Sequence, residues 1–121
     1  MPYDNNNIFA KILRDEIPCN KIYEDNYVLS FYDINPQKKI HALVIPKGKY
    51  VDLDDFNTNA SNDEIVGLMK GITIVSKKLG ISSSHGKGYR ALANISDYGG
   101  QEVPHLHFHL FGGEKVGKMV S

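Results

Sequence analysis

The feature that most constrains this chain is an alternating run near its C-terminus, His105-Leu106-His107-Phe108-His109-Leu110-Phe111. Successive side chains of a β-strand point to opposite faces, so such alternation is typical of a half-buried strand. We therefore expect a strand over residues 103–111, with the apolar side chains in the core and the three imidazoles on the other face. Same-face neighbours on a strand lie roughly 6–7 Å apart, which places one imidazole between two others.

Three interpretations of this run remain open. It could be a polar strand face with solvated histidines, although three of the five histidines in one alternating run make chance clustering a poor explanation. His-x-His on a strand could also ligate zinc, but the chain has no cysteine cluster, no His-x-x-x-His helix and no obvious acidic partner at ligand spacing. Finally, a neutral imidazole can act as a nucleophile while a neighbouring imidazole protonates the leaving group. The clustering favours this third interpretation.

The remaining periodicities predict an α+β fold with a mainly antiparallel sheet of about five strands, one long helix and one short helix. Besides 103–111, strands are expected over residues 21–24, 27–34, 40–45 and 89–95. The short helix is expected over residues 8–15, followed later by a loop with one helical turn over residues 52–59.

The long helix is expected over residues 62–79. Ser61 and Glu64 fit a capping box at its start, and Gly80 stands where a helix end favours a left-handed residue. Gly67 and Gly71 are costly inside a helix, so their i, i+4 spacing suggests close approach to a neighbouring element.

Length and charge narrow the classes of function. A chain of 121 residues is typical of one domain, here with a polar, frayed start (1–7) and a short tail (114–121). A net charge of zero argues against nucleic acid and anionic membranes as partners. The N-terminal residues 1–7 are polar and lack an apolar stretch long enough for a signal peptide, and no apolar run approaches the length of a membrane span. The single cysteine, Cys19, cannot form an internal disulfide, so we expect a cytoplasmic protein.

The alternating run resembles the His-φ-His-φ-His-φ-φ signature of the histidine triad (HIT) superfamily, in which φ is an apolar residue. Residues 8–12, 16–18, 31–37, 41–46 and 99–103 are also similar to the Hint branch, so the resemblance extends from about residue 8 to 113. The third histidine matters, because the Fhit-like and uridylyltransferase branches typically carry glutamine there. The resemblance implies a HIT-like fold, a single HIT domain, and a homodimer whose sheets join into one.

The resemblance also implies an activity. The expected enzyme hydrolyses purine nucleoside 5′-phosphoramidates or acyl-nucleotides, as a phosphoramidase does, and needs no metal or other cofactor. His107 would attack the α-phosphorus to give a nucleotidyl-histidine that water resolves into a nucleoside monophosphate. His105 and His109 would contact phosphate or assist the leaving group, and His41 would join the same polar network. The alternative is a nucleotide-binding regulatory module with vestigial activity.

The substrate contacts follow from the same resemblance. Asp33 would accept hydrogen bonds from the ribose hydroxyls, and Asn94 with the Gly100 and Gln101 backbone would hold the phosphate and leaving group. Glu102 stands where some Hint proteins carry serine near the leaving group. The base pocket would be lined by Ile8, Phe9, Ile12, Phe31 and Ile34.

Overall fold

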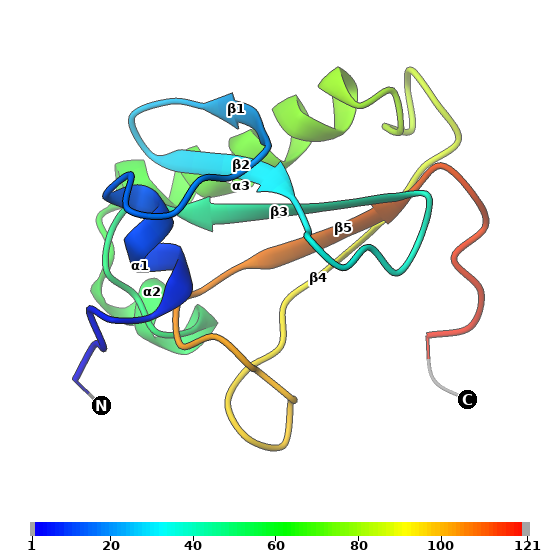
Figure 1. Cartoon of the computed structure of the whole chain (residues 1–121). Coiled ribbons are helices and arrows are strands. Elements are labelled where there is room, and N and C mark those ends of the chain that lie inside the picture. Colours follow the sequence, from blue (N-terminus) through cyan, green and yellow to red (C-terminus); the bar gives the residue numbers. More distant parts are fainter. Residues whose placement is uncertain (1, 120–121) are drawn as a thin grey trace.

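The computed structural model describes residues 2–119, and the expectations for residue 1 and residues 120–121 lie outside this range. Five strands form one antiparallel sheet in the order β1-β2-β3-β5-β4 (Figure 1). The elements are α1 (Ile8–Leu13), β1 (Lys21–Glu24), β2 (Val28–Tyr32), β3 (Ile40–Pro46), α2 (Leu53–Asn59), α3 (Asn62–Lys78), β4 (Arg90–Leu92) and β5 (Phe108–Gly112). The expected α+β fold with a five-stranded antiparallel sheet is confirmed.

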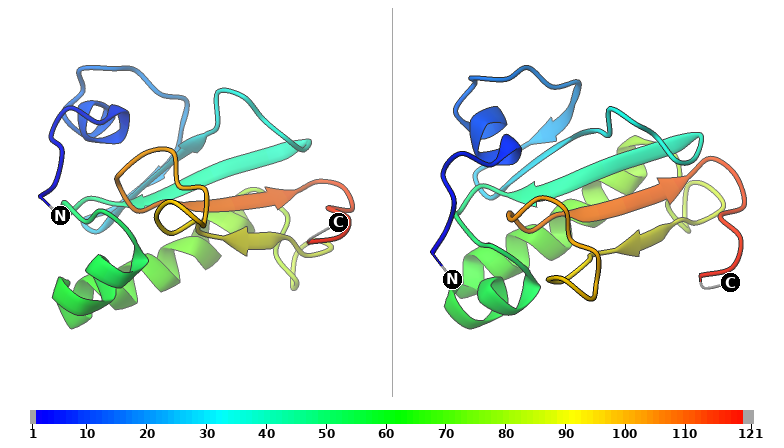
Figure 2. Two further views of the ribbon diagram at one scale, coloured as in Figure 1. Left: turned by 90° about the horizontal axis from the view of Figure 1, so that it is seen from below. Right: turned by 60° about the horizontal axis from the view of Figure 1, so that its bottom comes forward.

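The two faces of the sheet pack against different helices. Val28, Ala42 and Val44 join a core with Leu68 and Val75 of α3. The alternate strand residues belong to a second core, made by Leu29, Phe31, Leu43 and Ile45 with Phe9 and Ile12 of α1. The view from below in Figure 2 shows α1 and α3 on opposite sides of the sheet. Because successive strand residues point to opposite faces of the sheet, the side chains of β2 and β3 are divided between two apolar layers.

Local signals account for the long helix. Ser61 accepts a hydrogen bond from the Glu64 amide, and the Glu64 carboxylate accepts one from the Ser61 amide, which confirms the capping box. Gly80 has φ +73°, as expected after a helix end. A Cβ atom at Gly67 would lie 2.6 Å from the Tyr27 ring, and one at Gly71 would lie 3.0 Å from Val28. Both glycines therefore let α3 approach β2 closely.

Several elements differ in extent from the sequence-based expectations. Residues 53–59 form a seven-residue helix, α2, where one helical turn was expected. Its N-cap Asp52 accepts a hydrogen bond from Asp55, and its Phe56 is buried. Strand β2 is shorter than 27–34, because Asp33 begins a turn in which its carboxylate accepts from the Asn35 amide. Strand β4 ends at Leu92 because its last partner is His109, near the start of β5.

The largest correction concerns the strand expected over residues 103–111. Strand β5 begins only at Phe108, so His105 and His107 precede it. Pro104 has no N–H for a strand ladder, the His105 amide donates to the Val103 carbonyl in a tight turn, and the Leu106 amide donates to the Tyr50 carbonyl. The alternation nevertheless holds, because Leu106 and Leu110 lie in the α3 core.

The polar N-terminal segment, expected to fray, is held against the domain. Asn7 caps α1 by accepting a hydrogen bond from the Ala10 amide, and its own side chain donates to the Asp4 carbonyl. The Tyr3 hydroxyl lies within hydrogen-bond distance of His105 Nδ1. Among residues 2–119, no helix has the length and apolar character needed to cross a membrane.

Candidate active site

The hydrogen bond of His107 determines which of its ring nitrogens can react. Its Nδ1 lies 2.7 Å from the carbonyl oxygen of His105. Because a carbonyl can only accept, Nδ1 carries the hydrogen and the neutral ring has its lone pair on Nε2. No buried side-chain nitrogen or oxygen among the described residues lacks a partner. The Nε2 of His107, which has no partner among residues 2–119, is therefore accessible to solvent.

His105 lies behind His107 and is completely buried. Its Nε2 is 2.9 Å from the Pro46 carbonyl oxygen, and its Nδ1 is 2.5 Å from the Tyr3 hydroxyl. Both ring nitrogens are thus engaged, which leaves neither to touch a phosphate. The contribution of His105 to the site is its backbone carbonyl, which orients the His107 ring.

A second chain of hydrogen bonds determines the tautomer of His109. The Gln37 amide donates to His41 Nδ1 at 3.1 Å, so the neutral His41 ring carries its hydrogen on Nε2. That Nε2 lies 2.9 Å from His109 Nδ1. His109 Nδ1 therefore accepts, and its hydrogen lies on Nε2. The ring centroids of His107 and His109 are 5.0 Å apart. The site therefore presents the bare Nε2 of His107 beside the N–H donor of His109.

Burial keeps these four imidazoles neutral near pH 7. It lowers the pKa of His105 to about 4, and burial together with the nearby His107 and His41 lowers the pKa of His109 to about 4. Burial also lowers the pKa of His41, against the opposing charge of Asp33. The pKa of His107 is lowered by burial, while the His105 carbonyl and the charges of Asp33 and Glu102 oppose the shift. A neutral His107 is the form that can attack.

Asp33 adds a carboxylate to this group. Its Oδ2 lies 3.5 Å from His41 Nε2, too long for a strong hydrogen bond. One ligand atom each from Asp33, His41 and His109 lie within 4.8 Å of one another, so these residues could hold a metal ion. A metal at this place would have to replace the proton shared by His41 and His109. This acidic partner of the histidines comes from the turn after β2 and is not evident from ligand spacing in the sequence.

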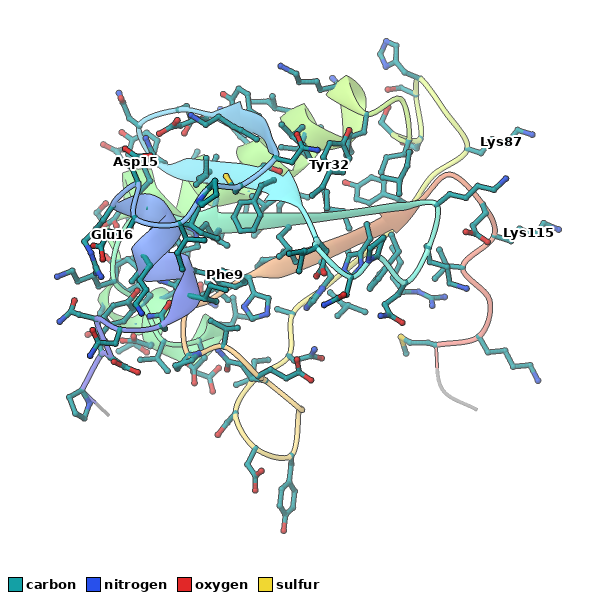
Figure 3. All side chains as sticks on the ribbon, viewed as in Figure 1. Phe9, Asp15, Glu16, Tyr32, Lys87 and Lys115 are labelled. Carbon is teal, nitrogen blue, oxygen red and sulfur yellow. The ribbon has the colours of Figure 1, made fainter. Side chains whose placement is uncertain are left out.

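A cavity of about 340 Å³ opens beside these side chains. Eight of the residues expected in the site line it: His41, His107, His109, Phe9, Asp33, Asn94, Gly100 and Glu102. The Phe9 ring packs edge-on against His107 with 4.9 Å between ring centroids. Figure 3 shows Phe9 on the side of α1 that faces the start of β5.

The other expected residues lie around the cavity without lining it. Ile12 and Phe31 are buried in the core beneath Phe9. Ile8 and Ile34 are exposed, with 46% and 91% of their surface accessible. The Gln101 side chain is turned inward and donates to the Val51 carbonyl at 2.6 Å.

The glycine loop differs from the expected phosphate cradle. The Gly100 amide donates to the Asp97 carbonyl, and the Gln101 amide donates to the Ser96 carbonyl. A phosphate contact through these two N–H groups therefore requires loop hydrogen bonds to break. Gly100 has φ +76°, a conformation that glycine adopts without strain.

Four residues lining the cavity were missed: Asn35, Gln37, Leu43 and Val103. Leu43 could have been found, because it stands two positions after His41 on the same face of a predicted strand. Val103 could have been found in the same way, because it stands two positions before His105 on the histidine face of the strand predicted over residues 103–111. Asn35 and Gln37 lie in a turn, where no periodicity places a side chain.

Comparisons with known proteins show what this chain is similar to. A model of the HIT domain family matches residues 14–116. The chain is 50% identical over 119 residues to an uncharacterized HIT-like protein of Azospirillum brasilense, covering 98% of this chain and 95% of the relative. It is 39% identical over 114 residues to a purine nucleoside phosphoramidase of Escherichia coli, covering 94% of this chain and 92% of the relative. A solved HIT family hydrolase from Clostridium thermocellum is 35% identical with a TM-score of 0.85, covering 98% of this chain and 99% of that one.

Proposed function

Because this chain belongs to the HIT domain family, we propose that it is a nucleotide-binding hydrolase that cleaves purine nucleoside 5′-phosphoramidates or acyl-nucleotides. The observation that carries the proposal is the unprotonated Nε2 of His107 beside the Nε2–H of His109. One nitrogen can attack phosphorus while the other donates a hydrogen bond to a phosphate oxygen. The similarity to a purine nucleoside phosphoramidase supports the choice of substrate class.

The proposed reaction has two steps at phosphorus. His107 Nε2 attacks the α-phosphorus, the bond to the leaving nitrogen or acyl oxygen breaks, and the leaving group departs with the electron pair. A leaving amine takes up a proton from solvent. Water then attacks the nucleotidyl-histidine and gives up a proton to solvent, the bond from phosphorus to Nε2 breaks, and a nucleoside monophosphate leaves with His107 neutral again.

The surroundings of His107 suit a covalent intermediate. Nucleotidyl transfer to Nε2 puts positive charge on a ring that keeps its hydrogen on Nδ1. The His105 carbonyl accepts from this Nδ1–H, and the negative charges of Asp33 and Glu102 favour the cationic ring. Groups fixed in this way before reaction stabilise charge as it develops.

The substrate is proposed to lie along the α1 side of the cavity. Asp33 lines the cavity and would accept hydrogen bonds from ribose hydroxyls. Ile8 and Ile34 are large, exposed apolar side chains next in sequence to the cavity residues Phe9 and Asp33. A purine base would cover them and remove apolar surface from water. Asn94 and Glu102 would then stand on the phosphate and leaving-group side.

We also propose a homodimer in the cytoplasm. Strand β4 is an edge strand of three residues, and its unpaired backbone groups could pair with a second copy to extend the sheet. Val66 and Met69 leave α3 with exposed apolar side chains that a partner would cover. The single cysteine fits a reducing compartment. Sedimentation equilibrium tests the dimer, and a monomer mass at micromolar concentration would refute it.

The test of the activity is hydrolysis of adenosine 5′-phosphoramidate without added metal, followed by release of AMP. We expect His107→Ala to abolish turnover and to leave AMP binding largely intact, because only the nucleophile is removed. The matched control is His85→Ala, since His85 is exposed in the loop after α3 and should leave turnover unchanged. Unchanged turnover in the His107 variant would exclude the proposed mechanism.

The grouping of Asp33, His41 and His109 supports one alternative, a histidine-ligated zinc protein. Elemental analysis of the purified protein, together with turnover before and after chelation, separates the two proposals. Stoichiometric zinc with activity lost to a chelator would favour the metal site. Metal-independent turnover favours attack by imidazole.

A further inference from the structure

The N-terminal segment contributes one side chain to the histidine cluster. The Tyr3 hydroxyl lies 2.5 Å from Nδ1 of His105, a residue 102 positions away. The two rings also pack edge to face, with centroids 5.6 Å apart and an interplanar angle of 74°. Tyr3 thus contacts the first histidine of the triad from the side opposite its Pro46 contact.

The direction of the Tyr3 hydrogen bond follows from the other end of the ring. His105 Nε2 faces the Pro46 carbonyl, which only accepts, so Nε2 carries the hydrogen. Burial lowers the pKa of His105 to about 4, so the ring is neutral and Nδ1 is bare. The Tyr3 O–H therefore donates to Nδ1. No part of His105 is solvent-accessible, so without Tyr3 this nitrogen would be buried and unpaired.

His105 in turn orients the nucleophile. Its carbonyl oxygen accepts the hydrogen bond from His107 Nδ1 and thereby leaves the lone pair on Nε2. With its ring held at both nitrogens, His105 has little freedom to rotate, and its carbonyl stays directed at His107. We propose that Tyr3 is a positioning residue for the nucleophile, acting through His105, an inference that rests on the function proposed above.

The segment that carries Tyr3 is itself anchored. The Asp4 carbonyl accepts hydrogen bonds from the Asn7 side chain at 2.7 Å and from the Asn7 amide at 3.2 Å. Asn7 is buried and caps α1, the helix from which Phe9 packs against both His105 and His107. Residues 3–7 therefore form a strap that joins α1 to the triad, and Tyr3 is its contact with the catalytic machinery.

The kinetic test is Tyr3→Phe, which removes the hydroxyl and keeps the ring. Loss of one hydrogen bond of ordinary strength predicts a fall in kcat of about threefold to tenfold. KM for adenosine 5′-phosphoramidate should stay unchanged, because Tyr3 does not line the cavity. The matched control is Tyr23→Phe, which removes a 2.8 Å hydrogen bond to Asp25 in a part of the sheet away from the histidines. A kcat for Tyr3→Phe equal to that of Tyr23→Phe would overturn the inference.

A second measurement does not depend on turnover. Nitrogen-15 NMR distinguishes the two neutral tautomers of histidine, and the wild type should show hydrogen on Nε2 of His105 and on Nδ1 of His107. In Tyr3→Phe, we expect the His107 signals to shift toward a mixture of tautomers. Unchanged His107 signals in the folded variant would overturn the inference. A wild type without turnover would instead refute the proposed function, while the NMR comparison would still decide the contact made by Tyr3.

Discussion

Acid should destabilise this protein through His105, because the buried ring is neutral and has no room for hydration when charged. Burial lowers its pKa to about 4 in the folded state, against an ordinary value of 6.5 in the unfolded chain. The unfolded state therefore binds a proton more tightly than the folded state. The stability that depends on the neutral ring is fully present above pH 6.5 and is lost as the pH falls toward 4.

The magnitude follows from the two pKa values. Each tenfold difference in proton affinity corresponds to about 1.4 kcal/mol, so complete protonation of His105 lowers the free energy of unfolding by roughly 3 kcal/mol. Most of it is reached by pH 4.5, where we expect a loss of about 2 kcal/mol relative to pH 7. Because His105 is completely buried, solvent screening should reduce this value little. A loss of this size is a large fraction of the stability of a typical small domain.

The assay is urea unfolding at pH 7 and at pH 4.5, with protein concentration held fixed in case dimer formation contributes. His105→Gln removes the titrating ring and keeps an amide donor toward the Pro46 carbonyl. We expect the variant to be less stable at pH 7, yet to lose about 2 kcal/mol less than the wild type on acidification. His85→Gln, at an exposed position, is the control and should lose as much stability as the wild type.

The refuting result is specific. If wild type and His105→Gln lose equal stability between the two pH values, His105 does not couple folding to protonation. The lowered pKa of the buried His105 ring would then be wrong. Loss of stability from carboxylates is common to both proteins and cancels in the comparison.

Two further predictions concern the pH profile and the packing of α3. Because burial lowers the pKa of His107 below 6.5, the acidic limb of kcat/KM for adenosine 5′-phosphoramidate should have its midpoint below pH 6.5. A midpoint above pH 6.5 would contradict a neutral, buried nucleophile. Gly67→Ala should lower the free energy of unfolding by about 1–3 kcal/mol, because the new Cβ would lie 2.6 Å from the Tyr27 ring. Thermal denaturation measures this, and a more stable variant would mean that α3 and β2 have room for a methyl group.

Much of the fold could be predicted from local patterns. The capping box at Ser61 and Glu64 and the left-handed Gly80 depend on neighbours within a few residues, so their sequence signals are complete in themselves. The alternation around His107 likewise depends only on extended backbone, and it placed Leu106 and Leu110 in the core although β5 begins later than expected. The sequence predicts only one turn of helix where the seven-residue α2 forms. This helix is stabilised by burial of Phe56, which depends on tertiary packing.

The sequence by itself determined which chemical groups this protein has and that the triad imidazoles alternate with Leu106 and Leu110 of the α3 core, because backbone periodicity is a local property. Only the tertiary structure decided what each imidazole does. His41 reaches His109 across 68 positions because β3 pairs with β5, and Tyr3 reaches His105 because α1 packs over the sheet. These distant partners select the tautomers, since the hydrogen on each neutral ring goes to the nitrogen that faces an acceptor.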